Sequence, residues 1–255
     1  MTPRTRMPVA SRRALGAAAF ALLAPAAAPA AHAQAACDCR TPLFPARWSV
    51  FVSTGAGTVE TSQINALLGA ANYYAVSDDA IGFGGGGFGS FGPLRLGAEH
   101  VRLDAGEEST PAGRAARLEA SYTTLTIGWD LRPRGRLSLA PTIGVGRGTY
   151  VLTVGDAAGG AAAAAGAGFA QVLATPGRES RLSGGHWLYE PMLAADLLVV
   201  RGSAQRRGIT VGARAGYRLA PNRADWEYRG ARASGGPIDQ AKGPIVRLTV
   251  GVGGR

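Results

Sequence analysis

The sequence predicts an all-β fold, namely an eight-stranded antiparallel up-and-down membrane β-barrel with one short helix in its first long loop. Three observations favour this class: segments in which apolar and polar residues alternate, connections that alternate between long and short, and 38 glycines among 255 residues. Alternation is informative because successive side chains of a strand point to opposite faces of the sheet. Glycine suits the crowded interior of a narrow barrel, where large side chains need small neighbours.

The clearest strand is the segment 208–220. One of its faces is apolar throughout and consists of Ile209, Val211, Ala213, Ala215, Tyr217 and Leu219. The other face carries small residues together with Arg214 and Arg218. Alternation alone would also fit a soluble sheet with one wet face. The length favours the membrane, because a tilted strand needs roughly 9–11 residues to cross a bilayer.

Seven further segments alternate in the same way. The first covers about ten residues from Trp48, and the others are 81–91, 94–103, 114–129, 137–154, 187–200 and 245–252. In the segment 114–129 the alternation blurs near Leu125 and Ile127, which indicates a β-bulge.

A different period appears between the first two predicted strands. Apolar residues recur there at helical spacing, at Ile64, Leu67, Leu68 and Ala71. This pattern predicts a short helix over 62–71, capped by Thr61 or Ser62.

The seven connections alternate strictly in length, beginning with a long one. They are 59–80, 92–93, 104–113, 132–135, 155–185, 201–207 and 221–243. A membrane barrel with both chain ends in the periplasm has short turns on that side and long loops outside, whereas a soluble sandwich has no reason for such alternation. The alanine- and glycine-rich segment 155–185 is predicted to be a long mobile loop.

The N-terminal region reads as an export signal. The segment before Ala14 contains four arginines and no acidic residue. An apolar run extends from Ala14 to Ala31, and small-x-small cleavage sites follow it. We therefore expect a signal peptide over 1–35, a linker over 36–46 and the barrel domain over 47–255. The Arg12-Arg13 pair leaves twin-arginine export open beside the general route. Cys37 and Cys39, the two cysteines, are expected to lie in an oxidised tail, since two ligands alone do not make a zinc site.

Charge excludes one class of partner. The formal net charge is +10, and removal of the four leader arginines lowers it to +6. The remaining arginines are scattered along strands and turns instead of forming a stripe, so no nucleic-acid partner is expected.

If the apolar faces meet lipid, the opposite faces fill the barrel lumen with charges of both signs. The predicted lumen charge network comprises Arg95, Glu99, Glu119, Glu190, Asp196, Arg214, Arg218 and Arg247. Buried charges need partners, so we expect arginine–carboxylate pairs that plug a lumen too narrow for an open channel. A small ion or proton pathway is the alternative.

Four aromatic residues lie near predicted strand ends, where an interfacial aromatic girdle would place them. They are Trp48, Trp129, Trp187 and Tyr189. In a soluble barrel the same residues would belong to the core.

The chain resembles the small eight-stranded outer-membrane barrels of the OmpA-like transmembrane domain group. The motif-like part comprises Ile64-Asn65-Ala66-Leu67-Leu68, Ser77-Asp78-Asp79 and the glycine-rich strand 84–89, and is similar to uncharacterised outer-membrane β-barrel proteins of environmental bacteria. The resemblance implies a porin-like barrel that lies in the outer membrane of a Gram-negative-type bacterium. It also implies contact with outer-membrane lipid, insertion by the barrel-insertion machinery and a monomeric state.

The sequence favours a structural or surface-interaction role over catalysis. One alternative is a soluble, lipocalin-like barrel that binds a hydrophobic ligand, with the arginines facing water. A second is a lipid-A-modifying barrel enzyme, for which the mature chain offers only His100 and His186, with Ser183 nearby in a predicted flexible loop. No cofactor fingerprint or metal-ligand cluster is present in the sequence, and the glycines of 84–89 do not follow a phosphate-loop context. We therefore predict no cofactor, no metal and no enzymatic activity.

Overall fold

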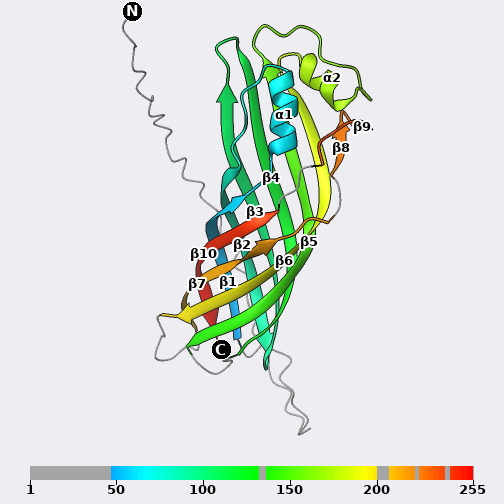
Figure 1. Cartoon of the computed structure of the whole chain (residues 1–255). Helices are drawn as coiled ribbons and strands as arrows, with labels where there is room; N and C mark the ends of the chain where they lie inside the picture. The colour runs from blue at the N-terminus through cyan, green and yellow to red at the C-terminus, as the bar shows by residue number, and fades with distance from the viewer. Residues whose placement is uncertain (1–46, 132–135, 200–206, 222–223, 239–241, 255) are drawn as a thin grey trace, which may run out of the picture. The chain divides into compact units, whose positions relative to one another are not determined.

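The computed structural model describes residues 47–131, 136–199, 207–221, 224–238 and 242–254 (Figure 1). The predicted signal peptide, the linker, Cys37 and Cys39 lie outside these residues and stay predictions. No helix among the described residues is long and apolar enough to cross a membrane.

Eight antiparallel strands form a closed ring, as the sequence predicts. They are β1 (Arg47–Thr58), β2 (Asp79–Phe91), β3 (Leu94–Ser109), β4 (Arg114–Trp129), β5 (Leu137–Asp156), β6 (Ser180–Leu198), β7 (Arg207–Arg218) and β10 (Gly243–Gly254). Pairing runs β5-β4-β3-β2-β1-β10-β7-β6, and a further β5–β6 pairing closes the ring. The first and last strands meet over a continuous register from Trp48–Gly254 to Gly57–Ile245.

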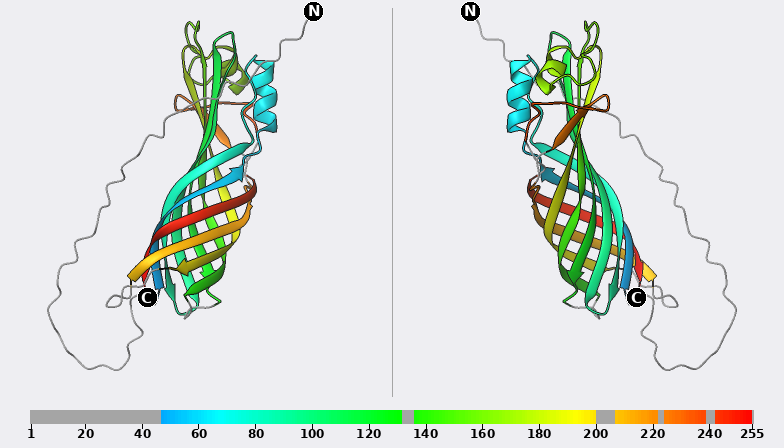
Figure 2. Two further views of the ribbon diagram at one scale, coloured as in Figure 1. Left: turned by 90° about the vertical axis from the view of Figure 1, so that its left-hand side faces the viewer. Right: turned by 90° about the vertical axis from the view of Figure 1, so that its right-hand side faces the viewer.

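The ring is uneven in height. Strands β3 to β6 have 16, 16, 20 and 19 residues, whereas β1, β2, β7 and β10 have 12 or 13. The four long strands therefore rise beyond the others at one end of the barrel, which we call the extended end (Figure 2). The opposite end, where β2 joins β3, is the short-turn end.

The extended end carries the additional elements. Helix α1 (Ser62–Ala70) confirms the predicted short helix. Helix α2 (Phe169–Ala174) and the hairpin of β8 (Asp225–Tyr228) and β9 (Ala231–Arg232) were not anticipated. The hairpin turns at Arg229 and Gly230, both with positive φ, as a two-residue turn requires.

The prediction of a mobile loop over 155–185 is wrong. Strand β6 already begins at Ser180, and α2 buries Phe169, Val172 and Leu173 completely or nearly so. Their spacing of three and four residues is helical. The surrounding alanines and glycines conceal it, because the segment as a whole has few large apolar side chains.

The side chains that point out of the ring form a continuous apolar band. Each ring strand contributes at least one large apolar side chain that is between 43% and 69% exposed: Val50, Phe83, Leu96, Leu125, Ile143, Leu193, Val211 and Leu248. Soluble proteins rarely leave so much contiguous apolar surface in water.

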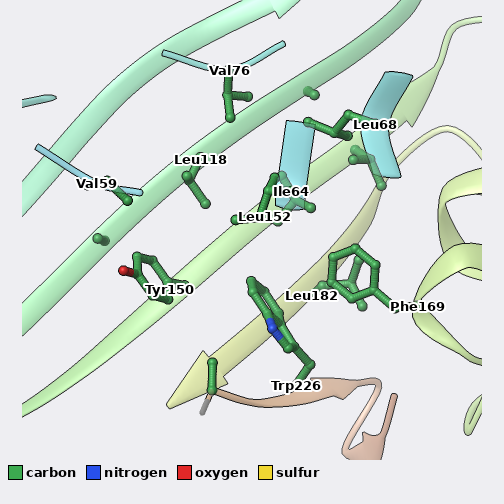
Figure 3. Close-up of a cluster of buried hydrophobic side chains, with 14 of the residues drawn as sticks. Val59, Ile64, Leu68, Val76, Leu118, Tyr150, Leu152, Phe169, Leu182 and Trp226 are labelled. Carbon is green, nitrogen blue, oxygen red and sulfur yellow. The ribbon is translucent and has the colours of Figure 1, made fainter. Parts of the chain in front are cut away.

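A compact hydrophobic core fills the inner side of the extended end (Figure 3). It combines Leu118 and Leu152 from the long strands with Ile64 of α1, Phe169 of α2 and Trp226 of β8. The core holds both helices and the hairpin against the inner face of the long strands.

The bulge predicted in β4 is absent. Its register with β5 runs unbroken from Arg114 to Gly128, and the only register shift with β3 lies between Asp104 and Glu107 of β3. The alternation blurs for a different reason. Leu118 and Tyr122 point inward into the apolar core, whereas Leu125 and Ile127 point outward into the apolar band. The geometry is constant, but the surroundings of each face change along the strand.

Candidate functional site: the charged interior

Below the apolar core, the barrel interior is lined with charged side chains. Alternation on β3, β6, β7 and β10 directs Glu99, Glu190, Arg214, Arg218 and Arg247 inward, and each is at most 6% exposed. Small neighbours make room for them. A Cβ atom on Gly212 would lie 2.5 Å from Asp196 Oδ1, so a larger residue there would displace a charged partner.

Arg247 joins the two carboxylates of the upper charged layer. Its Nη1 donates to Glu99 Oε2 at 3.0 Å, and its Nη2 donates to both Glu190 oxygens at 2.9 and 3.0 Å. Arg214 Nη1 donates to Glu99 Oε2 at 2.6 Å, and Arg218 Nε donates to Glu190 Oε1 at 2.8 Å. The layer thus holds three guanidinium groups around two carboxylates.

A second charged layer lies nearer the short-turn end. Arg95 and Asp196 form an ion pair of 2.6 Å, and Arg47 Nη2 donates to the backbone oxygen of Asp196 at 3.0 Å. Ser138 donates to Asp130 at 2.7 Å. These groups are all buried, and the layer contains two guanidinium groups and two carboxyl groups.

Aromatic rings support the guanidinium groups. Arg95 lies 3.4 Å from the ring centre of Phe88, Arg214 lies 4.0 Å from that of Phe51, and Arg218 lies 3.9 Å from that of Tyr122. Cation–π contacts of this kind strengthen when water is excluded. They also fix the planes of the guanidinium groups towards their carboxylates.

The structure brings together seven of the eight residues named for the lumen. Arg95, Glu99, Glu190, Asp196, Arg214, Arg218 and Arg247 are all buried and ion-paired. Glu119 is different, because it faces outward and pairs with Arg102 and Arg117. On β4, Glu119 points to the same side as Leu125 and Ile127, which is the outer side. The sequence-based prediction assumed that the apolar side of β4 near Leu118 faces lipid, and therefore placed Glu119 inside.

Sequence reasoning missed two participants in the lower layer, Arg47 and Asp130. Both lie at strand ends, where Arg47 begins β1 and Asp130 directly follows β4. If each predicted strand is extended by one residue, both side chains fall on the inward face. Arg47 then points to the same side as Ser49, and Asp130 to the same side as Gly128.

The four aromatics named for a girdle all point outward. Trp129, Trp187 and Tyr189 are 55%, 50% and 42% exposed, and Trp48 is partly exposed. Trp48 and Trp129 stand at the short-turn end. Trp187 and Tyr189 stand higher, where the apolar band of β6 gives way to polar positions.

Of the two histidines among the described residues, neither forms a pair with Ser183. His186 was expected in a flexible loop, yet it is buried within β6 and its ring stacks on Tyr150 with 4.7 Å between centres. Ser183 has the opposite parity on the same strand, so its side chain lies on the other face of the sheet. His100 is exposed on the outer face, where its Nδ1 lies 2.9 Å from Thr123 Oγ1.

Little free space lies beside the upper charged layer. A hollow lined by Ser53, Tyr122, Arg218 and Arg247 measures about 10 Å³, about the volume that one water molecule requires. Among the described residues, no group of three or more histidine, cysteine, aspartate or glutamate side chains could hold a metal ion.

No protein-family model matches this chain, and no curated protein matches it. The crystal structure of Neisserial surface protein A is similar over 82% of this chain and 96% of its own, with 8% identity and a TM-score of 0.40. The crystal structure of a major outer membrane protein from Thermus thermophilus is similar over 82% of this chain and 98% of its own, with 9% identity and a TM-score of 0.42. At these scores the likenesses decide neither fold nor function, so the barrel assignment rests on the strand pairing.

Proposed function

We propose that the protein is an outer-membrane β-barrel with a closed polar lumen and a structural or surface-interaction role. The single observation that carries the proposal is the outward apolar band, to which all eight ring strands contribute. A closed ring satisfies every strand edge, which is the condition for a sheet to cross a hydrocarbon layer. We further propose that the chain is monomeric and inserted by the barrel-insertion machinery.

The aromatic positions support the membrane placement. Trp48 and Trp129 at the short-turn end and Trp187 and Tyr189 higher on the barrel would mark the two membrane interfaces, where amphipathic rings are favoured. Short turns face the periplasm in such barrels, so the extended end would face the outside. The α1, α2 and β8–β9 elements would then form the surface available for interactions.

The interior supports closure of the lumen. Arg247 connects Glu99 with Glu190, and Arg214 and Arg218 fill the remaining directions around these carboxylates. An ion that crossed this layer would have to break several desolvated ion pairs. A structural polar core is therefore favoured over an ion or proton pathway.

The same interior disfavours both alternatives. A lipocalin-like cup needs an apolar cavity inside the barrel, but the interior below the apolar core is charged and the hollow beside its upper layer is only about 10 Å³. A lipid-A-modifying enzyme of the expected kind needs a serine close to a histidine, but Ser183 and His186 lie on opposite faces of β6.

Fractionation and refolding test the proposal. The mature chain is expected to remain with outer membranes after a carbonate wash, and to migrate faster on an unheated gel than after boiling. The folded chain should give no conductance steps in planar lipid bilayers. Recovery of the folded chain in buffer without detergent would overturn the membrane assignment, and regular conductance steps would overturn the closed lumen.

A further inference from the structure

The buried interior of the barrel contains one more guanidinium group than carboxyl groups. The upper charged layer has three arginines, Arg214, Arg218 and Arg247, and two carboxylates, Glu99 and Glu190. The lower layer contains two groups of each kind. Among the buried arginine and carboxyl side chains of the described residues, one positive charge is therefore left without a counter-charge. Such a charge is unfavourable in an interior that excludes water.

Arg218 carries N–H groups that the charged layer does not use. Its Nε donates to Glu190 Oε1 at 2.8 Å, but its Nη1 and Nη2 are buried and have no hydrogen-bond partner among the described residues. The side chain as a whole is 1% exposed. Each carboxylate oxygen of Glu99 and Glu190 already accepts a hydrogen bond from a neighbouring side chain. The four N–H groups on Nη1 and Nη2 of Arg218 therefore lack an acceptor.

Arg218 lines the small hollow beside the upper charged layer. Val101 and Leu103 of the apolar core also line it, so the hollow lies where the charged layer meets that core. Arg247 belongs to the lining as well, whereas neither carboxylate of the layer does. The hollow measures about 10 Å³, which is room for roughly one water-sized sphere.

We propose that this hollow binds one small inorganic anion of the size of chloride, held by Nη1 and Nη2 of Arg218. A water molecule would accept hydrogen bonds there, but only an anion also supplies the missing negative charge. Hydrogen bonds from a guanidinium group to an anion are charge-assisted, and therefore stronger than those to a neutral oxygen. The inference does not rest on the membrane placement, because every group that carries it lies inside the ring.

Unfolding at different chloride concentrations tests the site. The full mature chain is refolded in a neutral detergent and unfolded with urea at constant ionic strength, while chloride replaces gluconate, an anion too large for the hollow. The test variant is Arg218→Met, which removes the unused N–H groups and the excess charge together. The matched control is Arg232→Met, because Arg232 lies on β9 and its side chain is 82% exposed.

Wild type and control are expected to become more stable as chloride rises. If chloride binds the folded chain alone, each tenfold rise above its dissociation constant lowers the unfolding constant about tenfold. The unfolding constant of Arg218→Met should not respond to chloride beyond the general effect of exchanging the two anions. That general effect is measured on the same variant, since it has no site.

A second variant narrows the hollow and leaves every charge in place. Gly57 lines the hollow from β1, and its position on that strand points inward. A Cβ atom there would meet no atom closer than Ile245 Cγ2 at 3.4 Å, so the strand accommodates alanine. Gly57→Ala should therefore fold, but it should require more chloride than wild type for the same gain in stability.

Bromide locates the ion directly, even if Arg218→Met does not fold. Crystals of the wild-type chain grown in bromide should give one anomalous scattering peak within hydrogen-bond distance of Arg218 Nη1 or Nη2. Crystals without a peak there would show that water alone fills the hollow. Wild-type unfolding that ignores chloride, or a chloride response that Arg218→Met keeps in full, would equally overturn the proposal.

The outcomes separate this proposal from the proposed function. A chain that inserts into membranes and shifts on an unheated gel, but shows no chloride response, refutes the anion site and leaves the membrane barrel standing. A chain that responds to chloride but stays folded in buffer without detergent refutes the membrane assignment and leaves the anion site standing.

Discussion

Replacing Glu190 by glutamine tests the charged interior directly. The Glu190 carboxylate is fully buried and accepts three hydrogen bonds from two guanidinium groups, at 2.8, 2.9 and 3.0 Å. Glutamine keeps one acceptor oxygen but turns an amide N–H donor towards the Nη2 donor of Arg247. It also leaves three guanidinium groups around a single carboxylate, that of Glu99.

The expected loss of stability is large. Removing one partner of a buried ion pair costs about 3–5 kcal/mol, because the remaining charge stays desolvated. With a urea slope of about 2 kcal/mol per molar, the unfolding midpoint should fall by roughly 1.5–2.5 M. The assay is urea unfolding of the chain refolded in lipid vesicles, followed by tryptophan fluorescence. Glu107→Gln is the matched control, since Glu107 is exposed on β3 and its substitution should change stability by less than about 0.5 kcal/mol.

A second substitution identifies the cause. Adding Arg218→Met to the Glu190→Gln variant removes one of the uncompensated guanidinium groups and restores the charge balance of the upper layer. Part of the lost stability should therefore return, which gives a positive coupling in the double-mutant cycle. The reasoning is refuted if Glu190→Gln unfolds at the same urea concentration as Glu107→Gln, or if the two interior substitutions add without coupling.

Three further predictions concern other parts of the molecule. Phe169→Ala should destabilise the extended end by about 3–5 kcal/mol, because Phe169 is completely buried and packs edge-on to Trp226 with 5.1 Å between ring centres. Faster proteolysis within 157–179 should reveal this loss, while the heat-dependent gel shift stays unchanged. Tyr73→Phe should cost about 1 kcal/mol by removing the 3.1 Å hydrogen bond to the Leu173 backbone oxygen. Burial raises the pKa of Tyr73, so the wild-type contact should be complete below pH 10 and weaken as pH rises above it, and hydrogen exchange at α2 should show this alkaline loss in wild type but not in the phenylalanine variant. The double substitution Glu99→Ala with Arg247→Ala should open the upper charged layer, so conductance steps absent from wild type should appear in planar bilayers. A correctly folded variant without conductance steps would contradict the assignment of this layer as the barrier.

Alternation in the sequence predicted the eight ring strands and most of the interior charges. It succeeded on β7 and β10 because one face of each strand stays polar or small over its full length, as with Arg214 and Arg247. It failed on β4, where the inward face is apolar in the extended end and polar nearer the short turns. Alternation shows which residues share a face, but the surroundings of that face depend on the depth of each residue in the barrel.

The elements missed by sequence reasoning depend on contacts between distant segments. Phe169 and Trp226 look like isolated apolar residues in long connections, and each is buried only because the other segment and the long strands surround it. His186 likewise appeared solvated in a loop. It is buried because β6 starts seven residues earlier than predicted, which extends the alternation through that position.

Adjacent labels on β7 test the central claim most directly. Cysteine is introduced at Val211, which points outward, or at Thr210, which points inward, in a chain whose Cys37 and Cys39 are replaced by serine. Each variant is refolded into vesicles and carries a spin label. The label at Val211 is expected to collide with oxygen dissolved in the hydrocarbon and to be shielded from a water-soluble nickel complex, whereas the label at Thr210 should be shielded from both. Strong collision of the Val211 label with the nickel complex would show that water covers this face, and would contradict the account of the barrel as a membrane protein.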